Sequence, residues 1–149
     1  MKRAHIHPYL FFRGRCEEAL SFYEGALGAE VSLLLRHSDN PAPSAEYAVP
    51  PEFADKVMHA TFHVGGATLH ASDGSGSHEA RAFGGFSLSL QLPSQAEVEQ
   101  AFAALSEGGE VTLPLGKTFW SPCFGMLTDR FGIGWMLAVE SEGAETPSA

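Results

Sequence analysis

The stretch Gly28-Ala29-Glu30-Val31-Ser32-Leu33 returns 80 residues later as Gly108-Gly109-Glu110-Val111-Thr112-Leu113. At the same offset Leu10 falls on Leu90, so the similarity extends beyond the quoted stretch. Two copies of one supersecondary unit would give this correspondence, because equivalent positions then carry similar side chains. The chain is therefore predicted to contain two such units, related by a pseudo-twofold axis.

The offset changes in the second part of each copy. After the longest loop it is 66, so Gly66 falls on Gly132 and His70 falls on Met136. A loop that is longer by 14 residues in the first copy accounts for the difference. The matching positions are important for function, because paired units of this kind build a concave site from them.

Composition limits the classes of protein to consider. The 149 residues are 44% hydrophobic, enough for one core or two small packed units. A net charge of −9 disfavours nucleic acid and anionic membranes as partners, since both attract positive surfaces. No apolar run approaches the roughly 20 residues of a membrane span, and the first residues lack the apolar core of a signal peptide. We therefore expect a cytoplasmic protein in which Cys16 and Cys123 are free thiols, although they could pair.

Hydrophobic periodicity predicts the elements of the first half. Residues 6–13 alternate as a strand does, and a helical spacing from Cys16 to Leu27 ends at Gly28. A second strand over 29–36, a proline-rich loop over 37–57, and a hairpin of 58–64 with 67–72 complete this half.

The second half follows the same order. A strand is expected over 86–92, and Ser94 with Glu97 forms a capping box that opens a helix ended by Gly108. Further strands are expected near 110–115, 123–128 and 134–140, with a tight turn from Asp129 to Gly132. Each half therefore reads βαβββ. The predicted organisation is a first module over 1–73, a linker over 74–84, a second module over 85–140 and a flexible tail over 141–149.

The alternation also predicts which side of each sheet is functional. One parity of each strand is apolar and should pack under the helix. The other parity mixes aromatic, imidazole and polar side chains: His7, Tyr9, Phe11, Arg13, His59, Thr61, His63, Thr68, His70, Ser72, Ser87, Ser89, Gln91 and Met136. Such a face is typical of a ligand cup. The alternative is the solvated face that antiparallel sheets often have.

Several motifs resemble the vicinal oxygen chelate superfamily, which includes glyoxalase I, the bleomycin-resistance proteins and the extradiol dioxygenases. They are Leu10-Phe11-Phe12-Arg13-Gly14, Ala19-Leu20-Ser21-Phe22-Tyr23 and Leu27-Gly28. The closer likeness is to the PhnB-like branch, through Pro8-Tyr9-Leu10, Ser72-Asp73, Thr118-Phe119-Trp120, Phe124-Gly125 and Asp129-Arg130-Phe131-Gly132-Ile133-Gly134-Trp135. The resemblance implies an α+β glyoxalase-like fold, in which two βαβββ repeats form a curved mixed sheet with helices on its outer face. It also implies a homodimer whose strands complete each cup.

The metal enzymes of this superfamily place ligands at four positions, which are His7, His70, Ser87 and Met136 in this sequence. The two histidines are competent ligands. A neutral hydroxyl and a thioether have almost no affinity for Zn²⁺, Ni²⁺ or Fe²⁺. Other side chains could complete a site: His5, His59, His63 or the sulfur of Cys123. A histidine on a sheet face is, however, more often a hydrogen-bonded wall residue.

Three functional hypotheses follow. The first is a protein that binds a small, cationic or aromatic molecule in the cup without the full metal site and without a cofactor. Its candidate contacts are Tyr9, Phe11, His63, Ser87, Trp120 and Met136. The alternative is a lyase, isomerase or dioxygenase that uses Zn, Ni, Fe or Mn on His7 and His70. A dimeric scaffold with a vestigial cup also stays open, and no residue is named as catalytic.

Local chemistry suggests structural roles for two carboxylates. Asp129 lies in a tight turn and Asp73 at the end of a strand, where capping of backbone N–H groups is the favoured role. Trp120 and Phe124 are equally compatible with a ligand wall or with closure of the core.

Overall fold

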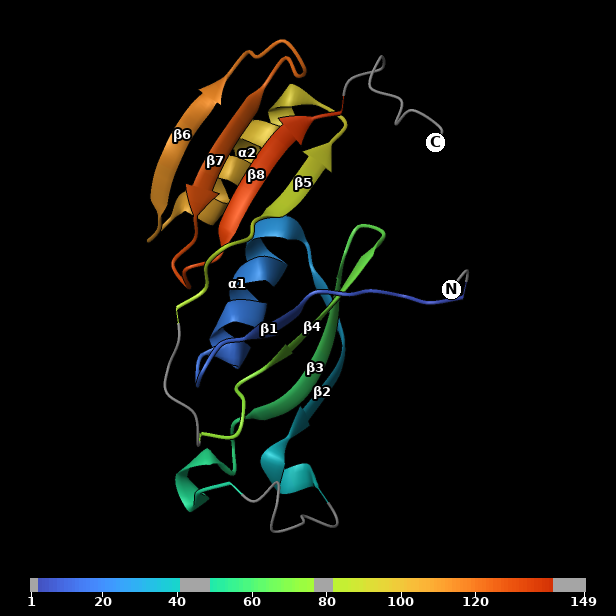
Figure 1. Ribbon diagram of the computed structural model, residues 1–149, viewed down its shortest axis with the longest axis vertical. Helices are drawn as coiled ribbons and strands as arrows, with labels where there is room; N and C mark the ends of the chain where they lie inside the picture. Colours follow the sequence, from blue (N-terminus) through green and yellow to red (C-terminus); the bar gives the residue numbers. More distant parts are fainter. Residues whose placement is uncertain (1–2, 41–48, 77–81, 141–149) are drawn as a thin grey trace. The chain divides into compact units, whose positions relative to one another are not determined.

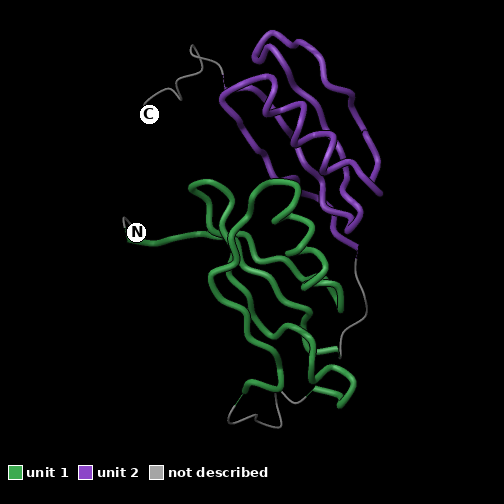
Figure 2. The backbone as a smooth tube through the Cα atoms, turned by 180° about the vertical axis from the view of Figure 1, so that it is seen from behind, with its two compact units in different colours: residues 1–80 green, residues 81–149 purple. Residues whose placement is uncertain are grey.

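A four-stranded sheet and one helix make up each half of the chain (Figure 1). The computed structural model describes residues 3–40, 49–76 and 82–140. Two compact units divide the chain, residues 1–80 and residues 81–149 (Figure 2). The predicted tail over 141–149 lies outside the described residues, as do parts of the predicted loop and linker.

The first unit follows the predicted order of elements. They are β1 (Tyr9–Phe11), α1 (Cys16–Leu27), β2 (Glu30–Arg36), the 3₁₀ turns His37–Asp39 and Pro51–Phe53, β3 (Val57–Val64) and β4 (Ala67–Ser72). The sheet has the order β1-β4-β3-β2, with β1 parallel to β4 and the other pairs antiparallel. The first strand is shorter than the predicted 6–13. Pro8 has no N–H for the ladder, and Arg13 leaves the strand conformation with φ 54°.

The second unit repeats this arrangement with β5 (Leu88–Leu92), α2 (Gln95–Ser106), β6 (Glu110–Gly116), β7 (Phe124–Thr128) and β8 (Gly134–Val139). Its sheet order is β5-β8-β7-β6, and β5 is parallel to β8. Tyr9 pairs with His70 in the first sheet and Ser89 pairs with Met136 in the second. Tyr9 and Ser89 are 80 residues apart and His70 and Met136 are 66 apart, so the two pairs occupy equivalent positions in the two sheets. The predicted α+β fold of two repeats is confirmed.

Local signals set the ends of the helices. Gly28 adopts φ 67° after α1, and its N–H and that of Ala29 bond to carbonyls of the last turn. The Ser94 hydroxyl accepts the Glu97 N–H at 3.2 Å, which caps α2 as predicted. The Glu97 carboxylate accepts the hydroxyl hydrogen of Ser94 at 3.0 Å. In a full capping box it would instead accept the backbone N–H of Ser94.

Each helix packs on one face of its own sheet. The side chains between them are the apolar parity of the strands. In the first unit Tyr23 stacks on Phe62 with ring centroids 6.1 Å apart, and both are buried. In the second unit Val98 and Leu105 of α2 are fully buried, as is Leu137 of β8. The opposite parity is consequently left on the helix-free face of each sheet, which we call the open face.

The described residues include no helix that is both long and apolar enough to cross a membrane. Both cysteines are free and buried, as expected.

Candidate functional site

The open face of the first sheet carries half-exposed aromatic rings beside imidazoles. Tyr9 is 44% exposed and Phe11 is 51% exposed, and their rings stack with centroids 5.1 Å apart. Tyr9 lies in register with His70 on β4, and His70 lies in register with Thr61 on β3. One row of side chains therefore crosses three strands on this face.

Four side chains of this face form a continuous chain of hydrogen bonds. The Tyr9 hydroxyl lies 2.9 Å from His59 Nδ1, and His59 Nε2 lies 3.3 Å from Thr61 Oγ1. The same Thr61 oxygen lies 3.0 Å from His70 Nδ1. We call Tyr9, His59, Thr61 and His70 the hydroxyl–imidazole chain. It begins at a phenol and ends at an imidazole, and its members alternate in type.

Further imidazoles surround this chain. The His7 ring lies 5.4 Å from the His70 ring, and the His59 ring lies 5.2 Å from it. Burial, followed by the charges of His59, His7 and His63, lowers the pKa of His70 below the usual 6.5. His70 is accordingly a neutral imidazole at neutral pH, with one N–H and one acceptor nitrogen.

His63 has hydroxyl partners at both ring nitrogens. Its Nδ1 lies 3.1 Å from Thr68 Oγ1 and its Nε2 lies 2.9 Å from Ser32 Oγ. Glu30 of β2 pairs in register with it at the end of the sheet. His63 is therefore held as a wall residue beside the hydroxyl–imidazole chain.

The open face of the second sheet has a different chemistry. Met136 pairs in register with Ser89 and with Met126. Ser87 is exposed and lies just before β5. Trp120 is 51% exposed and packs edge-on against Phe124, with centroids 5.4 Å apart. Phe124 is buried, so this pair contributes both to the core and to the surface.

The predicted site residues thus divide between the two units. His7, Tyr9, Phe11, His63 and His70 come together on the first open face. Ser87, Trp120 and Met136 belong to the second unit. The sequence pattern placed Thr61 on the correct face but did not show that its hydroxyl lies between the imidazoles of His59 and His70. The signal available in the sequence was that Thr61 has the same strand parity as His59 and His63.

The donors at the superfamily's ligand positions do not fit a catalytic metal. Such a site takes about three nitrogen, oxygen or thiolate ligands. Two of the four positions hold Ser87 and Met136, and within the described ranges no three His, Cys, Asp or Glu side chains are grouped to hold an ion. Burial raises the pKa of Cys16 to about 12 and also raises that of Cys123, so both thiols stay protonated.

The two buried carboxylates have structural partners. Asp73 accepts the N–H groups of Gly14, Cys16 and Val57 at 2.7, 2.8 and 2.9 Å. Asp129 accepts the N–H groups of Phe131 and Ile133 at 2.9 and 3.1 Å, and the indole N–H of Trp135 at 2.9 Å. The capping roles expected from the sequence are confirmed.

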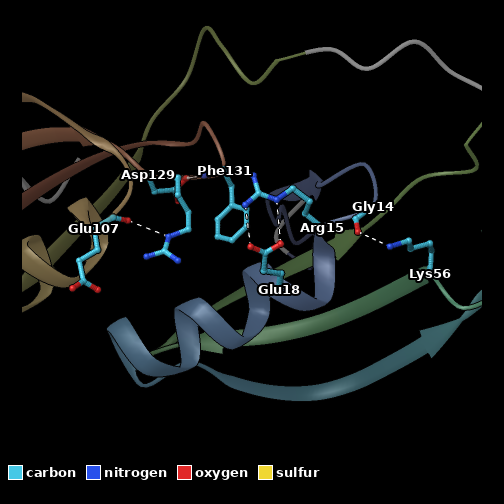
Figure 3. Close-up of polar contacts among 8 residues, drawn as sticks. Gly14, Arg15, Glu18, Lys56, Glu107, Asp129 and Phe131 are labelled. Atoms are coloured by element: carbon cyan, nitrogen blue, oxygen red, sulfur yellow. Dashed lines mark hydrogen bonds and ion pairs between the residues drawn. The ribbon is translucent and has the colours of Figure 1, made fainter.

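A charged pocket of about 310 Å³ lies at the loop end of the first unit. Its lining residues are Gly14, Glu17, Arg36, Asp55, Lys56, Val57 and Asp73. Arg36 pairs with Glu17, and Lys56 Nζ donates to the Gly14 carbonyl at 2.9 Å. Figure 3 shows this Lys56 contact and the ion pair between Arg15 and Glu18 at 3.0 Å. Both cations of the pocket, Arg36 and Lys56, are thus already bonded to protein atoms. The open face of the first sheet is therefore the stronger candidate for a ligand site.

The comparison with known proteins agrees with this fold. The family description "Glyoxalase/Bleomycin resistance protein/Dioxygenase superfamily" matches residues 5–137. The chain belongs to this superfamily. It is 32% identical over 139 residues to the protein YjdN of Escherichia coli strain K12, covering 90% of this chain and 94% of that protein.

Two solved structures are similar in sequence as well as in fold. The chain is 44% identical to protein PA1353 from Pseudomonas aeruginosa, with a TM-score of 0.80 over 92% of this chain and 98% of that one. It is 26% identical to the PhnB protein from Bacillus cereus, with a TM-score of 0.74 over 92% and 100% of the two chains. That structure is described as a putative 3-demethylubiquinone-9 3-methyltransferase. The predicted likeness to PhnB-like proteins of the superfamily is confirmed.

Proposed function

We propose that this member of the superfamily binds a small planar organic molecule on the open face of its first sheet, without a resident divalent metal. The observation that carries the proposal is the stacked pair of Tyr9 and Phe11, each about half exposed, beside the hydroxyl–imidazole chain. Ligand sites typically combine apolar and aromatic walls with a few placed polar groups. A ring can lie against Tyr9 and Phe11 while the imidazoles orient its polar atoms.

The wider lining of the site belongs to the same proposal. His63 has a fixed orientation and adds a polar wall to the first open face. On the second unit, taken by itself, Ser87, Trp120 and Met136 form a separate set of candidate contacts, because they are accessible or partly accessible and chemically mixed. A homodimer is also proposed, since superfamily members of this size commonly pair.

Ligand binding is tested by a thermal-shift screen of planar small molecules against the wild-type protein, Phe11→Ala and Ile6→Ala. Ile6 is 96% exposed and has the opposite parity to the open face, so it serves as a matched control. We expect hits that stabilise the wild type and Ile6→Ala but lose most of their effect in Phe11→Ala. A ligand that stabilises all three proteins equally would place binding elsewhere.

The absence of a resident metal is tested by elemental analysis of protein purified without a tag or chelator. The expected result is far less than one Zn, Ni, Fe or Mn per chain, because hydroxyl and thioether donors replace two ligands. The double variant His7→Ala with His70→Ala is the control. Near-stoichiometric metal that this variant loses would contradict the proposal and favour a metal-dependent lyase, isomerase or dioxygenase.

A further inference from the structure

In the hydroxyl–imidazole chain, the direction of each hydrogen bond depends on the direction of the others. Thr61 has one hydroxyl hydrogen, and its oxygen contacts two imidazole nitrogens, His59 Nε2 and His70 Nδ1. Within the described residues the hydroxyl has no other acceptor. When all the bonds of the chain are made, Thr61 therefore donates to one imidazole and accepts from the other.

This restriction allows two arrangements of the chain. In the first, Tyr9 donates to His59 Nδ1, His59 Nε2–H donates to Thr61, and Thr61 donates to His70 Nδ1. In the second, every donor and acceptor is reversed, so that His70 Nδ1–H donates to Thr61 and His59 Nδ1–H donates to Tyr9. Both arrangements are written for neutral imidazoles, the ordinary state of the ring well above a pH of about 6.5.

The two ends of the chain consequently have opposite character. In the first arrangement the Tyr9 oxygen is an acceptor and His70 Nε2–H is a donor. In the second, the Tyr9 O–H is a donor and His70 Nε2 is an acceptor. Among the described residues of the protein, His70 Nε2 has no hydrogen-bond partner. The ring centroids of Tyr9 and His70 lie 5.8 Å apart. The two residues that carry the ends of the hydroxyl–imidazole chain are therefore neighbours on the open face.

We propose that this open face selects planar ligands that present one hydrogen-bond donor next to one acceptor, as a cyclic amide does. This inference names the ligand class of the proposed binding site and rests on that proposal. The aromatic pair of Tyr9 and Phe11 receives the flat ring, and the two chain ends receive the amide N–H and C=O. A ligand with acceptors only would leave one end of the chain without a partner, which weakens binding by about tenfold.

The arrangement of hydrogens has a direct spectroscopic test. Both arrangements put His59 and His70 in the same tautomer, either both Nε2–H or both Nδ1–H. We expect long-range ¹H–¹⁵N spectra of histidine-labelled protein, recorded at a pH of about 8 where imidazoles are neutral, to show matching tautomers for the two rings. His59→Gln and His70→Gln assign the signals. This experiment needs no ligand, and opposite tautomers for His59 and His70 would overturn the inference.

Ligand selection is tested by calorimetry with two matched probes. 2-Quinolone has a ring N–H beside its carbonyl, and N-methyl-2-quinolone has the same ring without the donor. We expect 2-quinolone to bind the wild-type protein about tenfold more tightly. Equal binding of both probes would overturn the inference while leaving the proposed binding function in place.

Thr61→Val separates the chain from a general effect of the aromatic surface. It removes the central hydroxyl with little change in shape, and we expect the preference for 2-quinolone to fall to less than about threefold. Thr68→Val is the matched control, because Thr68 bonds to His63 on the same face outside the chain. A preference that survives in Thr61→Val, or vanishes equally in both variants, would overturn the inference. If neither probe binds the wild-type protein, the inference is overturned and the proposed function is left to its own screen.

Discussion

Asp73 shows how one carboxylate organises the loop end of the first unit. It is 3% exposed and accepts three backbone N–H groups from two segments, the turn that leads into α1 and the start of β3. Asp73→Ala should lower the free energy of unfolding by about 3–5 kcal/mol, because buried donors lose their acceptor. Urea denaturation measures the change. Asp55→Ala is the control, since this exposed residue of the same pocket should change stability by less than about 0.5 kcal/mol. Equal effects would contradict the assigned role.

His70 gives the first unit a defined dependence on pH. Its pKa in the folded protein is lower than the usual 6.5, so the unfolded chain binds more protons at mildly acidic pH. Its contribution to stability is complete above pH 6.5 and is lost as the pH falls through its folded pKa. We expect the urea midpoint of His70→Gln to fall less steeply than that of the wild type below pH 6.5.

Ile6→Ala is the control for this pH effect. Ile6 is 96% exposed and carries no titratable group, so its variant should keep the wild-type slope. Parallel slopes for the wild type and His70→Gln would contradict the prediction.

At the scale of elements, β7 is packed closely against both α2 and β6. A Cβ added at Gly125 would lie 2.8 Å from Phe102 Cε2, 2.8 Å from Leu115 Cδ2 and 3.0 Å from the Leu113 oxygen. Gly125→Ala should therefore destabilise the protein by about 1–3 kcal/mol through overpacking. Thermal and urea unfolding measure the loss.

Gly116→Ala is the matched control for this contact. A Cβ at Gly116, in the neighbouring strand β6, would have no atom within 4 Å. Its effect should stay within about 0.5 kcal/mol. Similar losses in both variants would show that the backbone of the sheet, rather than the contact with α2, sets the cost.

For the whole molecule we expect a dimer in solution. Sheet order leaves β6 at an edge, where Val111 and Leu113 are each 43% exposed. An apolar edge strand with unpaired backbone groups is a natural place for pairing with a second copy. Sedimentation velocity should give twice the mass of one chain. Leu113→Asp should shift the equilibrium toward monomer and Thr112→Asp should not. A wild-type monomer would contradict the expectation.

Short-range patterns predicted most of the architecture. The offsets of 80 and 66 between the repeats reappear as equivalent register pairs, Tyr9 with His70 and Ser89 with Met136. Gly28 and Ser94 end and begin their helices as predicted. These features depend on residues close in sequence, whose chemistry already selects the local backbone. The length of β1 was predicted less well, because Pro8 has no N–H for the ladder and Arg13 leaves the strand conformation with φ 54°.

The sequence by itself determined the two-repeat fold, the parity of each strand and most side chains of the open faces. Ser72, which was predicted on the first of these faces, is 3% exposed, and its hydroxyl bonds to the backbone of Val57 and Gly74. Only the tertiary structure decided that Thr61 lies between His59 and His70, and that Tyr9 closes the other end of the chain. The physical reason is the range of the interactions involved. Periodicity assigns a side chain to a face, whereas a hydrogen bond of about 3 Å between strands depends on the register of three strands and on side-chain rotamers.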